Sequence, residues 1–407
     1  MPSRRRHRLL IALVAFAGAL GLLALGAWIG GRHPQAVPAP IRSQLTGSED
    51  RRVVNEALDL IESTYYRKVP RSQIADDAIA GAVAKLRDRF SNYFTPAEYE
   101  RFKEEQDSRF TGVGVSVAPD PKGLKVMRVF DDSPADEAGI VPGDVFVAAD
   151  GKSLAGVSSD VATSRVKGPE GTDVRLTVEQ DGRERTLNLT RRRVSVPVVE
   201  ARMREACGKK IGVVALSQFS SGAHAEVYAA LRRLDKQGAD AFVFDLRGNG
   251  GGLVDEAQLI ASAFLPDGKI VTTRGRNVPE KTLDATGRPV IPKDAEVVVL
   301  VDRGTASASE IVAGALQDRD RATIVGTRTF GKGVFQQVIE LSNGGALDIT
   351  AGQYFTPKGR NLGGQGVAAG VGIKPDVRAK DDPTTRADEG LRAALETAGG
   401  CADEPQG

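Results

Sequence analysis

A short run of β-branched and apolar residues, Val297–Val301, leads into a turn of small residues and then into a helical pattern. Such a run is typical of a buried strand. Further strands are predicted at 210–216 and 241–245, and a helical pattern follows each of them. Strands that alternate with helices usually form a sheet covered by helices. We therefore predict an α/β core with a partly parallel sheet over residues 196–378.

Ser307 lies at the junction between the strand predicted at 297–301 and the helix that follows it. With Glu310 it forms a Ser-x-x-Glu capping box, a common way to begin a helix. The neighbours Gly304, Ala306 and Ala308 are small, however, and leave the hydroxyl accessible. A helix N-terminus also stabilises developing negative charge. Ser307 is therefore a candidate nucleophile as well as a candidate helix cap.

A nucleophilic serine needs a base, and the sequence offers few. Of the three histidines, His7 and His33 flank an apolar N-terminal run, so His224 alone could serve a Ser-His-Asp triad. His224 lies in what reads as an exposed first helical turn, which argues against that role. The alternative base is a lysine whose pKa is lowered by burial. Lys332, placed between two glycines among apolar residues, is the candidate.

The segment from Gly326 to Lys332 also matches the Gly-x4-Gly-Lys part of a phosphate-binding P-loop. The hydroxyl residue that should follow the lysine is missing, because Gly333 stands there. A second glycine-rich loop, Gly248–Gly252, could bind phosphate, ease a backbone turn or direct N–H groups at an oxyanion. We therefore rank a P-loop nucleotide hydrolase below a Ser-Lys enzyme.

Residues 109–195 change to short strands and turns. A strand is predicted at 124–130, and Ser133–Ile140 reads as a short capped helix. This region resembles a PDZ domain, which binds a peptide as an added strand at its sheet edge. In such domains one loop presents backbone N–H groups to the terminal carboxylate of the peptide. The residues of that loop here are Thr111, Gly112, Val113 and Gly114.

The N-terminal segment, residues 1–31, combines clustered arginines with the apolar run Leu9–Gly30. A run of this length can cross a bilayer, which needs roughly 20 residues. The arginines predict a cytoplasmic N-terminus and an extracytoplasmic body at the cell membrane. We prefer a single-pass anchor, with a cleaved signal peptide and a secreted body as the alternative. A proline-containing linker is predicted at 32–49, and a helical region at 50–108. The helices could simply pack against the core or could support self-association.

The composition excludes several classes of partner. Lys plus Arg exceed Asp plus Glu by only 55 to 53, so nothing indicates a nucleic-acid partner. With one histidine in the folded part and no metal-site spacing, we expect no metal and no other cofactor. Cys207 and Cys401 could form one disulfide in an exported body, or could remain separate thiols. A C-terminal helix and tail are predicted at 379–407.

Several motifs together resemble one family, the C-terminal processing peptidases, also called tail-specific proteases. They are Asp245–Gly252, Thr305–Glu310, Gly331–Gln336 and Tyr354–Arg360, and the PDZ region precedes them. The likeness runs from about residue 50 to Val377. It implies a ClpP/crotonase-like protease core with an inserted PDZ domain and N-terminal helices, in addition to the predicted transmembrane helix.

The resemblance also implies roles for individual residues. Ser307 would be the acylated nucleophile and Lys332 the general base. Gln336 would orient the lysine, on the same face if the segment is helical. Backbone N–H groups of Gly252 and Ala308 would form the oxyanion hole. Glu310 would act as a helix cap or as support for the lysine, and the sequence does not choose between the two.

The implied activity is that of a serine endopeptidase that binds proteins with apolar, free C-terminal tails. In this family the PDZ domain also gates the site through a basic residue before a Gly-x-x-Gly-Thr turn. Here that residue is Lys167, where arginine is more usual, so a bidentate contact would be lost. The rival hypothesis is a catalytically inactive, membrane-tethered PDZ scaffold. A homo-oligomer or a regulatory partner remains open.

Overall fold

The computed structural model describes residues 49–106, 109–364, 371–382 and 384–401. The described residues divide into two compact units, one ending at Lys85 and the other beginning at Leu86. The predicted anchor at 9–30 lies outside the described residues. Within the described ranges, no helix is long and apolar enough to cross a membrane.

The described part of the first unit, residues 49–85, contains two helices, α3 (Glu49–Thr64) and α4 (Arg71–Ala84), as the helical spacing predicts. An ion pair of 2.9 Å between Arg71 and Asp59 joins them. In the second unit the predicted helical region is interrupted by a strand, β1 (Asn92–Phe94), before α5 (Pro96–Gln106). The strand forms because it pairs with residues 346–348, a partner that local spacing does not reveal.

The core of the second unit is a six-stranded sheet in the order β10-β11-β12-β15-β16-β19. The β10–β11 pair is antiparallel, and the remaining pairs are parallel. This confirms the predicted α/β core with a partly parallel sheet. The strands are β10 (Val199–Ala206), β11 (Lys209–Leu216), β12 (Ala241–Asp245), β15 (Glu296–Val301), β16 (Thr323–Gly326) and β19 (Val377–Arg378).

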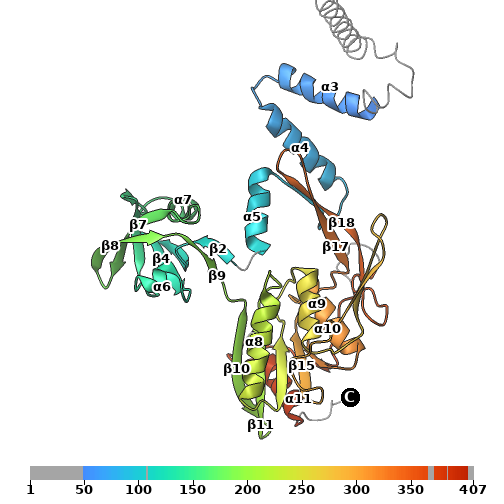
Figure 1. The fold of residues 1–407 in the computed structure, drawn as a ribbon. Helices are drawn as coiled ribbons and strands as arrows, with labels where there is room; N and C mark the ends of the chain where they lie inside the picture. The colour runs from blue at the N-terminus through green and yellow to red at the C-terminus, as the bar shows by residue number, and fades with distance from the viewer. Residues whose placement is uncertain (1–48, 107–108, 365–370, 383, 402–407) are drawn as a thin grey trace, which may run out of the picture. The chain divides into compact units, whose positions relative to one another are not determined.

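Helices cover both faces of this sheet (Figure 1). Alternate residues of a strand point to opposite faces, so the continuous apolar runs are buried on both sides. In β15, Val297 and Val299 pack with α8 (Ala223–Lys236), α9 (Val254–Ser262) and α10 (Ala308–Asp318). Val298 and Leu300 instead pack with α11 (Glu389–Gly399).

A second, antiparallel sheet has the order β1-β18-β13-β14, with β17 paired to β18. Gln336 lies on β17, so the segment after Lys332 is a strand and the helical spacing considered for these two residues is wrong. The segment is a strand because it pairs with β18. The register of this β17–β18 pairing shifts between Phe335 and Gln336. The strands are β13 (Lys269–Gly275), β14 (Lys281–Asp284), β17 (Val334–Glu340) and β18 (Ala346–Phe355).

The PDZ region forms its own sheet in the order β3-β4-β5-β7-β8, with β6 paired to β5 and a separate apolar core. The chain enters through β2 (Arg109–Gly112) and leaves through β9 (Arg192–Ser195), which pair with each other. The other elements are β3 (Val115–Asp120), β4 (Gly123–Val129), α6 (Pro134–Glu137), β5 (Val145–Ala149), β6 (Lys152–Ser153), α7 (Ser159–Val166), β7 (Asp173–Gln180) and β8 (Arg183–Thr190).

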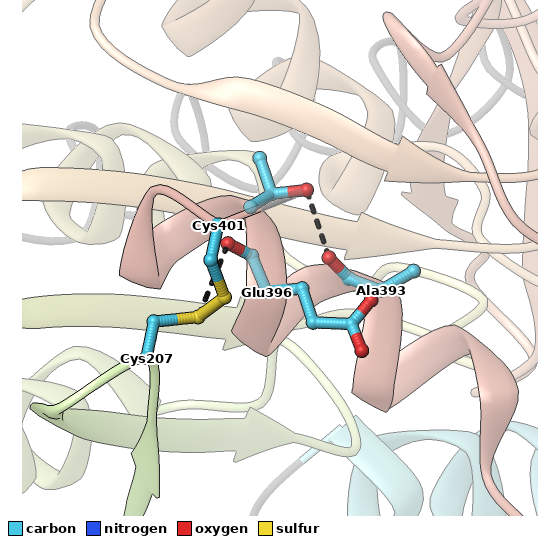
Figure 2. The surroundings of a disulfide bond; sticks show 5 residues. Cys207, Ala393, Glu396 and Cys401 are labelled. Atoms are coloured by element: carbon cyan, nitrogen blue, oxygen red, sulfur yellow. Dashed lines mark hydrogen bonds between the residues drawn. A yellow bond between two sulfur atoms is a disulfide. The ribbon is translucent and has the colours of Figure 1, made fainter. Parts of the chain in front are cut away.

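A disulfide joins Cys207, in the β10–β11 turn, to Cys401, just after α11 (Figure 2). The two Cα atoms are 5.9 Å apart. The backbone N–H of Cys401 donates to the carbonyl of Glu396, which caps the helix end. The sequence allowed either a disulfide or two thiols, and the structure has the disulfide. It fastens the end of the helix that covers one face of the central sheet.

Candidate active site

Ser307 occupies a strained turn between β15 and α10. Its φ is 57° and its ψ is −117°, and only 6% of the residue is exposed. A positive φ is uncommon for a residue other than glycine, and such strain is often found at functional sites. An ordinary N-cap has extended backbone geometry instead. The conformation therefore favours a nucleophile over a simple helix cap.

Glu310 ties this turn to the segment that carries Lys332. Its carboxylate is fully buried, and its Oε2 accepts the backbone N–H of Ser307 at 3.0 Å and that of Lys332 at 2.8 Å. Its Oε1 accepts the N–H of Gly331 at 2.8 Å and the hydroxyl of Thr329. Burial raises the pKa of Glu310, while these four hydrogen bonds oppose the rise. One side chain thus performs both roles left open by the sequence, reaching back to the helix start and positioning the lysine segment.

The same contacts argue against a P-loop. A P-loop needs free backbone N–H groups to hold phosphate. The N–H groups of Gly331 and Lys332 donate to the carboxylate of Glu310, so they are not free to bind phosphate. The lysine is also followed by strand β17 rather than by a helix.

Lys332 is largely buried, and burial lowers the pKa of its amine. Its Nζ lies over the ring of Phe90, 4.9 Å from the centroid. The carboxylates of Asp348 and Asp88 oppose the effect of burial and raise the pKa of Lys332, whereas the nearby Arg89 lowers it further. A lysine with a lowered pKa is what a Ser-Lys enzyme requires.

The two candidate catalytic side chains are not in direct contact. Within the described part of the chain, no hydrogen bond joins the Ser307 hydroxyl to the Lys332 amine. The Ser307 side chain instead lies close enough to Tyr354 on β18 to lower the pKa of its phenol. Burial raises the pKa of Tyr354 well above its ordinary value, so the phenol keeps its proton. The structure therefore brings the serine and lysine segments together but leaves the amine turned towards Phe90.

The side chain of Gln336 hydrogen-bonds a residue of β18. Its Nε2 donates to the hydroxyl of Thr350 at 3.3 Å. The backbone N–H of Thr350 donates to the Ser91 hydroxyl, which in turn donates to Asp88. Gln336 is thus connected to the surroundings of Lys332 through β18 and the segment before β1. Among the described residues, no hydrogen bond links it to the lysine.

Two backbone N–H groups, one next to Ser307 in the chain and one in the loop that packs on the serine turn, have no hydrogen-bond partner within the described ranges. One is that of Ala308, the first residue of α10, and the other is that of Gly252, which follows β12. The adjacent Gly251 packs closely against the serine turn, because an added Cβ would lie 2.8 Å from the Ala308 nitrogen and from the Ser307 Cβ. The N–H of Gly251 itself donates to Asn249. The loop after β12 is therefore held against the candidate nucleophile.

Comparison with known proteins decides the family. Residues 210–379 match Peptidase family S41, residues 111–190 match a PDZ domain, and residues 18–97 match the N-terminal domain of the activating protease CtpB. A carboxyl-terminal-processing protease of Synechocystis is 37% identical over 78% of this chain and 75% of its own length. The chain belongs to peptidase family S41. It is a serine-type peptidase of the C-terminal-processing class.

Two further similarities agree with this assignment. A CtpA-like serine protease of Staphylococcus haemolyticus is 33% identical over 83% of this S41 peptidase and 66% of the relative. The solved structure of a photosystem II D1 C-terminal processing protease is 30% identical and has a TM-score of 0.51. The match covers 88% of this peptidase and 100% of the chain in the solved structure. The predicted PDZ domain and protease class are thereby confirmed.

The PDZ domain of the peptidase has a small apolar cavity of about 50 Å³. The predicted loop residues Gly112, Val113 and Gly114 line it, together with Lys167 at the end of α7, and Thr111 precedes them on β2. The N–H groups of Val113 and Gly114 donate to no other described residue. The structure thus places Lys167, predicted as a gating residue, beside the loop predicted to bind a carboxylate.

His224 has a structural role in this peptidase. Its Nδ1 lies 2.9 Å from Glu256, whose carboxylate also accepts the backbone N–H groups of Gly222 and His224. These contacts fix the start of α8. No cluster of His, Cys, Asp or Glu that could hold a metal is found in the parts of the chain that are described.

Sequence reasoning missed several neighbours of the S41 site. Tyr354 lies close to Ser307, Phe90 packs on Lys332, and Asp348 is close enough to Lys332 to raise its pKa. Tyr354 belongs to one of the motifs that carry the family resemblance, which is the one available signal. Nothing local marks Phe90 or Asp348, because sheet pairing brings them to the site.

Proposed function

We propose that this S41 peptidase hydrolyses peptide bonds through Ser307 as nucleophile and Lys332 as general base. The observation that carries the proposal is the shared carboxylate of Glu310, which holds the strained serine turn and the lysine segment together. The unpartnered N–H groups of Ala308 and Gly252 support an oxyanion hole beside the serine.

The reaction would proceed by acyl transfer. The neutral amine of Lys332 takes the proton of the Ser307 hydroxyl, and the serine oxygen bonds to the peptide carbonyl carbon. The negative charge on the carbonyl oxygen is stabilised by the two N–H groups. The lysine then returns its proton to the leaving amine as the C–N bond breaks. Water hydrolyses the acyl-enzyme by the same steps, with the lysine again as base.

The arrangement described above would be a resting state, because the lysine amine lies over Phe90. Rotation of the Lys332 amine towards Ser307 would complete the Ser-Lys dyad. Gln336, on β17, would orient the amine. Such completion by substrate or partner is common among enzymes with gated sites. Gating through Lys167 stays a prediction, as does the ClpP/crotonase-like description of the core.

The PDZ domain would select the substrates. Its apolar cavity suits an apolar terminal side chain, and the free N–H groups of Val113 and Gly114 suit a terminal carboxylate. We therefore propose protein substrates with apolar, free C-terminal tails. The relative named for D1 C-terminal processing is consistent with this mode of recognition.

The location would be extracytoplasmic, at the cell membrane. The Cys207–Cys401 disulfide supports an oxidising compartment. The arginines before the apolar run at 9–30 support an anchor with a cytoplasmic N-terminus. A cleaved, secreted form is the alternative, and self-association or a regulatory partner remains a prediction.

The test is a cleavage assay with the full chain in detergent and an unfolded protein that ends in an apolar tail. Ser307→Ala and Lys332→Ala should each abolish cleavage, and Lys269→Ala, an exposed lysine, should not. Amidation of the tail should slow cleavage and weaken binding. If both active-site variants cleave like wild type, the Ser-Lys assignment is wrong. If wild type and all the variants fail to cleave while the tail still binds, the inactive scaffold becomes the better hypothesis.

A further inference from the structure

A cavity of about 650 Å³ opens at the carboxyl ends of β15 and β16, apart from the PDZ cavity. Two segments that lead to the catalytic residues form part of its wall, Asp302–Arg303 before Ser307 and Thr327–Arg328 before Lys332. The segment 374–381, which includes β19, closes another side. Ligands of sheets with parallel strands commonly bind outside the carboxyl ends of the strands, and a cavity of this size suits a small molecule.

The lining of this cavity is strongly cationic. Six basic side chains and two carboxylates contribute to it. Arg247 is already neutralised, because it pairs with Asp245 and Asp388. The remaining five basic residues make no ion pair with the described residues, and we call them the basic cleft: Arg303, Arg328, Lys374, Arg378 and Lys380.

The two carboxylates of the lining reduce this charge but are outnumbered by the cations, and their oxygens are already engaged by the protein. Asp302 accepts the N–H groups of Gly248 at 2.9 Å and Gly304 at 2.8 Å. Asp381 accepts the N–H of Gly390 at 2.8 Å and contacts Arg247. Their acceptor oxygens hold loops in place. A cavity in which charges of one sign predominate focuses the electrostatic field and attracts counter-ions.

We propose that the basic cleft binds a compact, multivalent phosphate-bearing ligand. Its cations come from three short segments that converge on one hollow, so they match an anion whose charges are concentrated. An extended acidic peptide spaces its charges at roughly 3.3 Å per residue and fits such a convergence less well. Three of the five cations are arginines, whose planar fork binds phosphate oxygens in pairs. The ligand would be a free polyphosphorylated molecule or the headgroup of a phospholipid.

The first experiment is titration calorimetry of the full chain in detergent with inorganic tripolyphosphate at low ionic strength. We expect saturable binding at one site. The variant Lys374→Gln/Lys380→Gln removes two exposed cations of the cleft and should weaken binding roughly tenfold or more, as loss of charge-assisted contacts predicts. Its matched control, Lys236→Gln/Lys269→Gln, makes the same charge change outside the cavity. The control should bind as wild type does.

Equal weakening in both variants would show that binding follows net charge, and would overturn the proposal, as would the absence of saturable binding. Melting temperatures of both variants should match wild type, which separates a lost site from a lost fold. Since binding does not require peptide hydrolysis, the result is independent of the Ser-Lys assignment.

Two further probes identify the source of the ligand. Calorimetric titration with detergent micelles that contain an anionic phospholipid, compared with micelles that contain a zwitterionic one, should show binding by wild type and the control but not by the cleft variant if the ligand is a headgroup. Equal binding of the anionic micelles by all three proteins, with tripolyphosphate binding still lost in the cleft variant, assigns the cleft to a free phosphorylated molecule. A hexaglutamate peptide that binds more tightly than tripolyphosphate, with the same sensitivity to the cleft variant, would overturn the choice of phosphate.

Discussion

The carboxylate of Glu310 accepts the backbone N–H of Lys332 at 2.8 Å. Because the same oxygen also accepts the N–H of Ser307, this buried residue fixes the distance between the serine turn and the lysine segment. A hydrogen bond to a buried charge is costly to lose, since the group left behind is neither solvated nor paired.

Glu310→Gln should damage both stability and catalysis. The amide would turn an N–H towards at least one of the groups that now donate to the carboxylate. We expect a loss of about 2–4 kcal/mol in the free energy of unfolding of the core and a roughly hundredfold fall in kcat. Urea unfolding and the cleavage assay measure these effects. The exposed Glu205→Gln serves as the control, and equal behaviour of the two variants would contradict the bridging role.

Gly251→Ala should disrupt the site through packing alone. Its φ is +100°, and an added Cβ would lie 2.8 Å from the Ala306 oxygen, the Ala308 nitrogen and the Ser307 Cβ. The serine turn or the loop after β12 must then move, and a shift of about 1 Å can cost roughly hundredfold in rate.

The matched control for this variant is Gly250→Ala. An added Cβ there would meet no heavy atom within 4 Å, and its φ is not in the left-handed region. We expect near wild-type cleavage from this control. Comparable losses in the two variants would mean that the whole loop needs flexibility, rather than that Gly251 packs on the nucleophile.

Cleavage should rise with pH through the pKa of Lys332. Only the neutral amine can accept the serine proton, and burial lowers that pKa below the ordinary 10.5, so the rise should occur at lower pH than for a free lysine. Asp348 raises the pKa of Lys332 against this trend. Asp348→Asn should therefore move the acid limb of the kcat/KM profile to lower pH.

The control for the pH profile is Asp284→Asn, on the exposed side of β14. It removes a carboxylate from the same sheet and should leave the profile unchanged. An upward shift in Asp348→Asn would show that this carboxylate does not act on the lysine as a counter-charge.

Reduction of the Cys207–Cys401 disulfide should lower the melting temperature of the core. The bond closes a loop with a sequence separation of 194 residues, and cross-links of long loops stabilise by about 2–5 kcal/mol. Calorimetric melting with and without a reductant measures the change. The variant Cys207→Ser/Cys401→Ser should melt like the reduced wild type and should not respond to the reductant. An unchanged melting temperature on reduction would show that packing alone holds α11.

The sequence by itself determined the local features of this peptidase. Runs such as Val297–Val301 are short, apolar and β-branched, as is typical of buried strands, and helical patterns follow them, so the sequence predicted the α/β core. The small residues around Ser307 and its spacing to Glu310 placed a helix start at the candidate nucleophile. Glycine-rich turns and alternating strands indicated the PDZ domain, and ordered motifs indicated the family.

Tertiary structure decided which distant groups meet. Pairing of β17 with β18 made the Gln336 segment a strand and brought Tyr354 to Ser307. Packing of the chain before β1 placed Phe90 on Lys332. Local spacing records only the preferences of neighbouring residues, whereas these contacts depend on strand register and burial across the whole core. The capping Glu310 illustrates the difference, since its spacing predicts one backbone bond and the fold supplies three more partners.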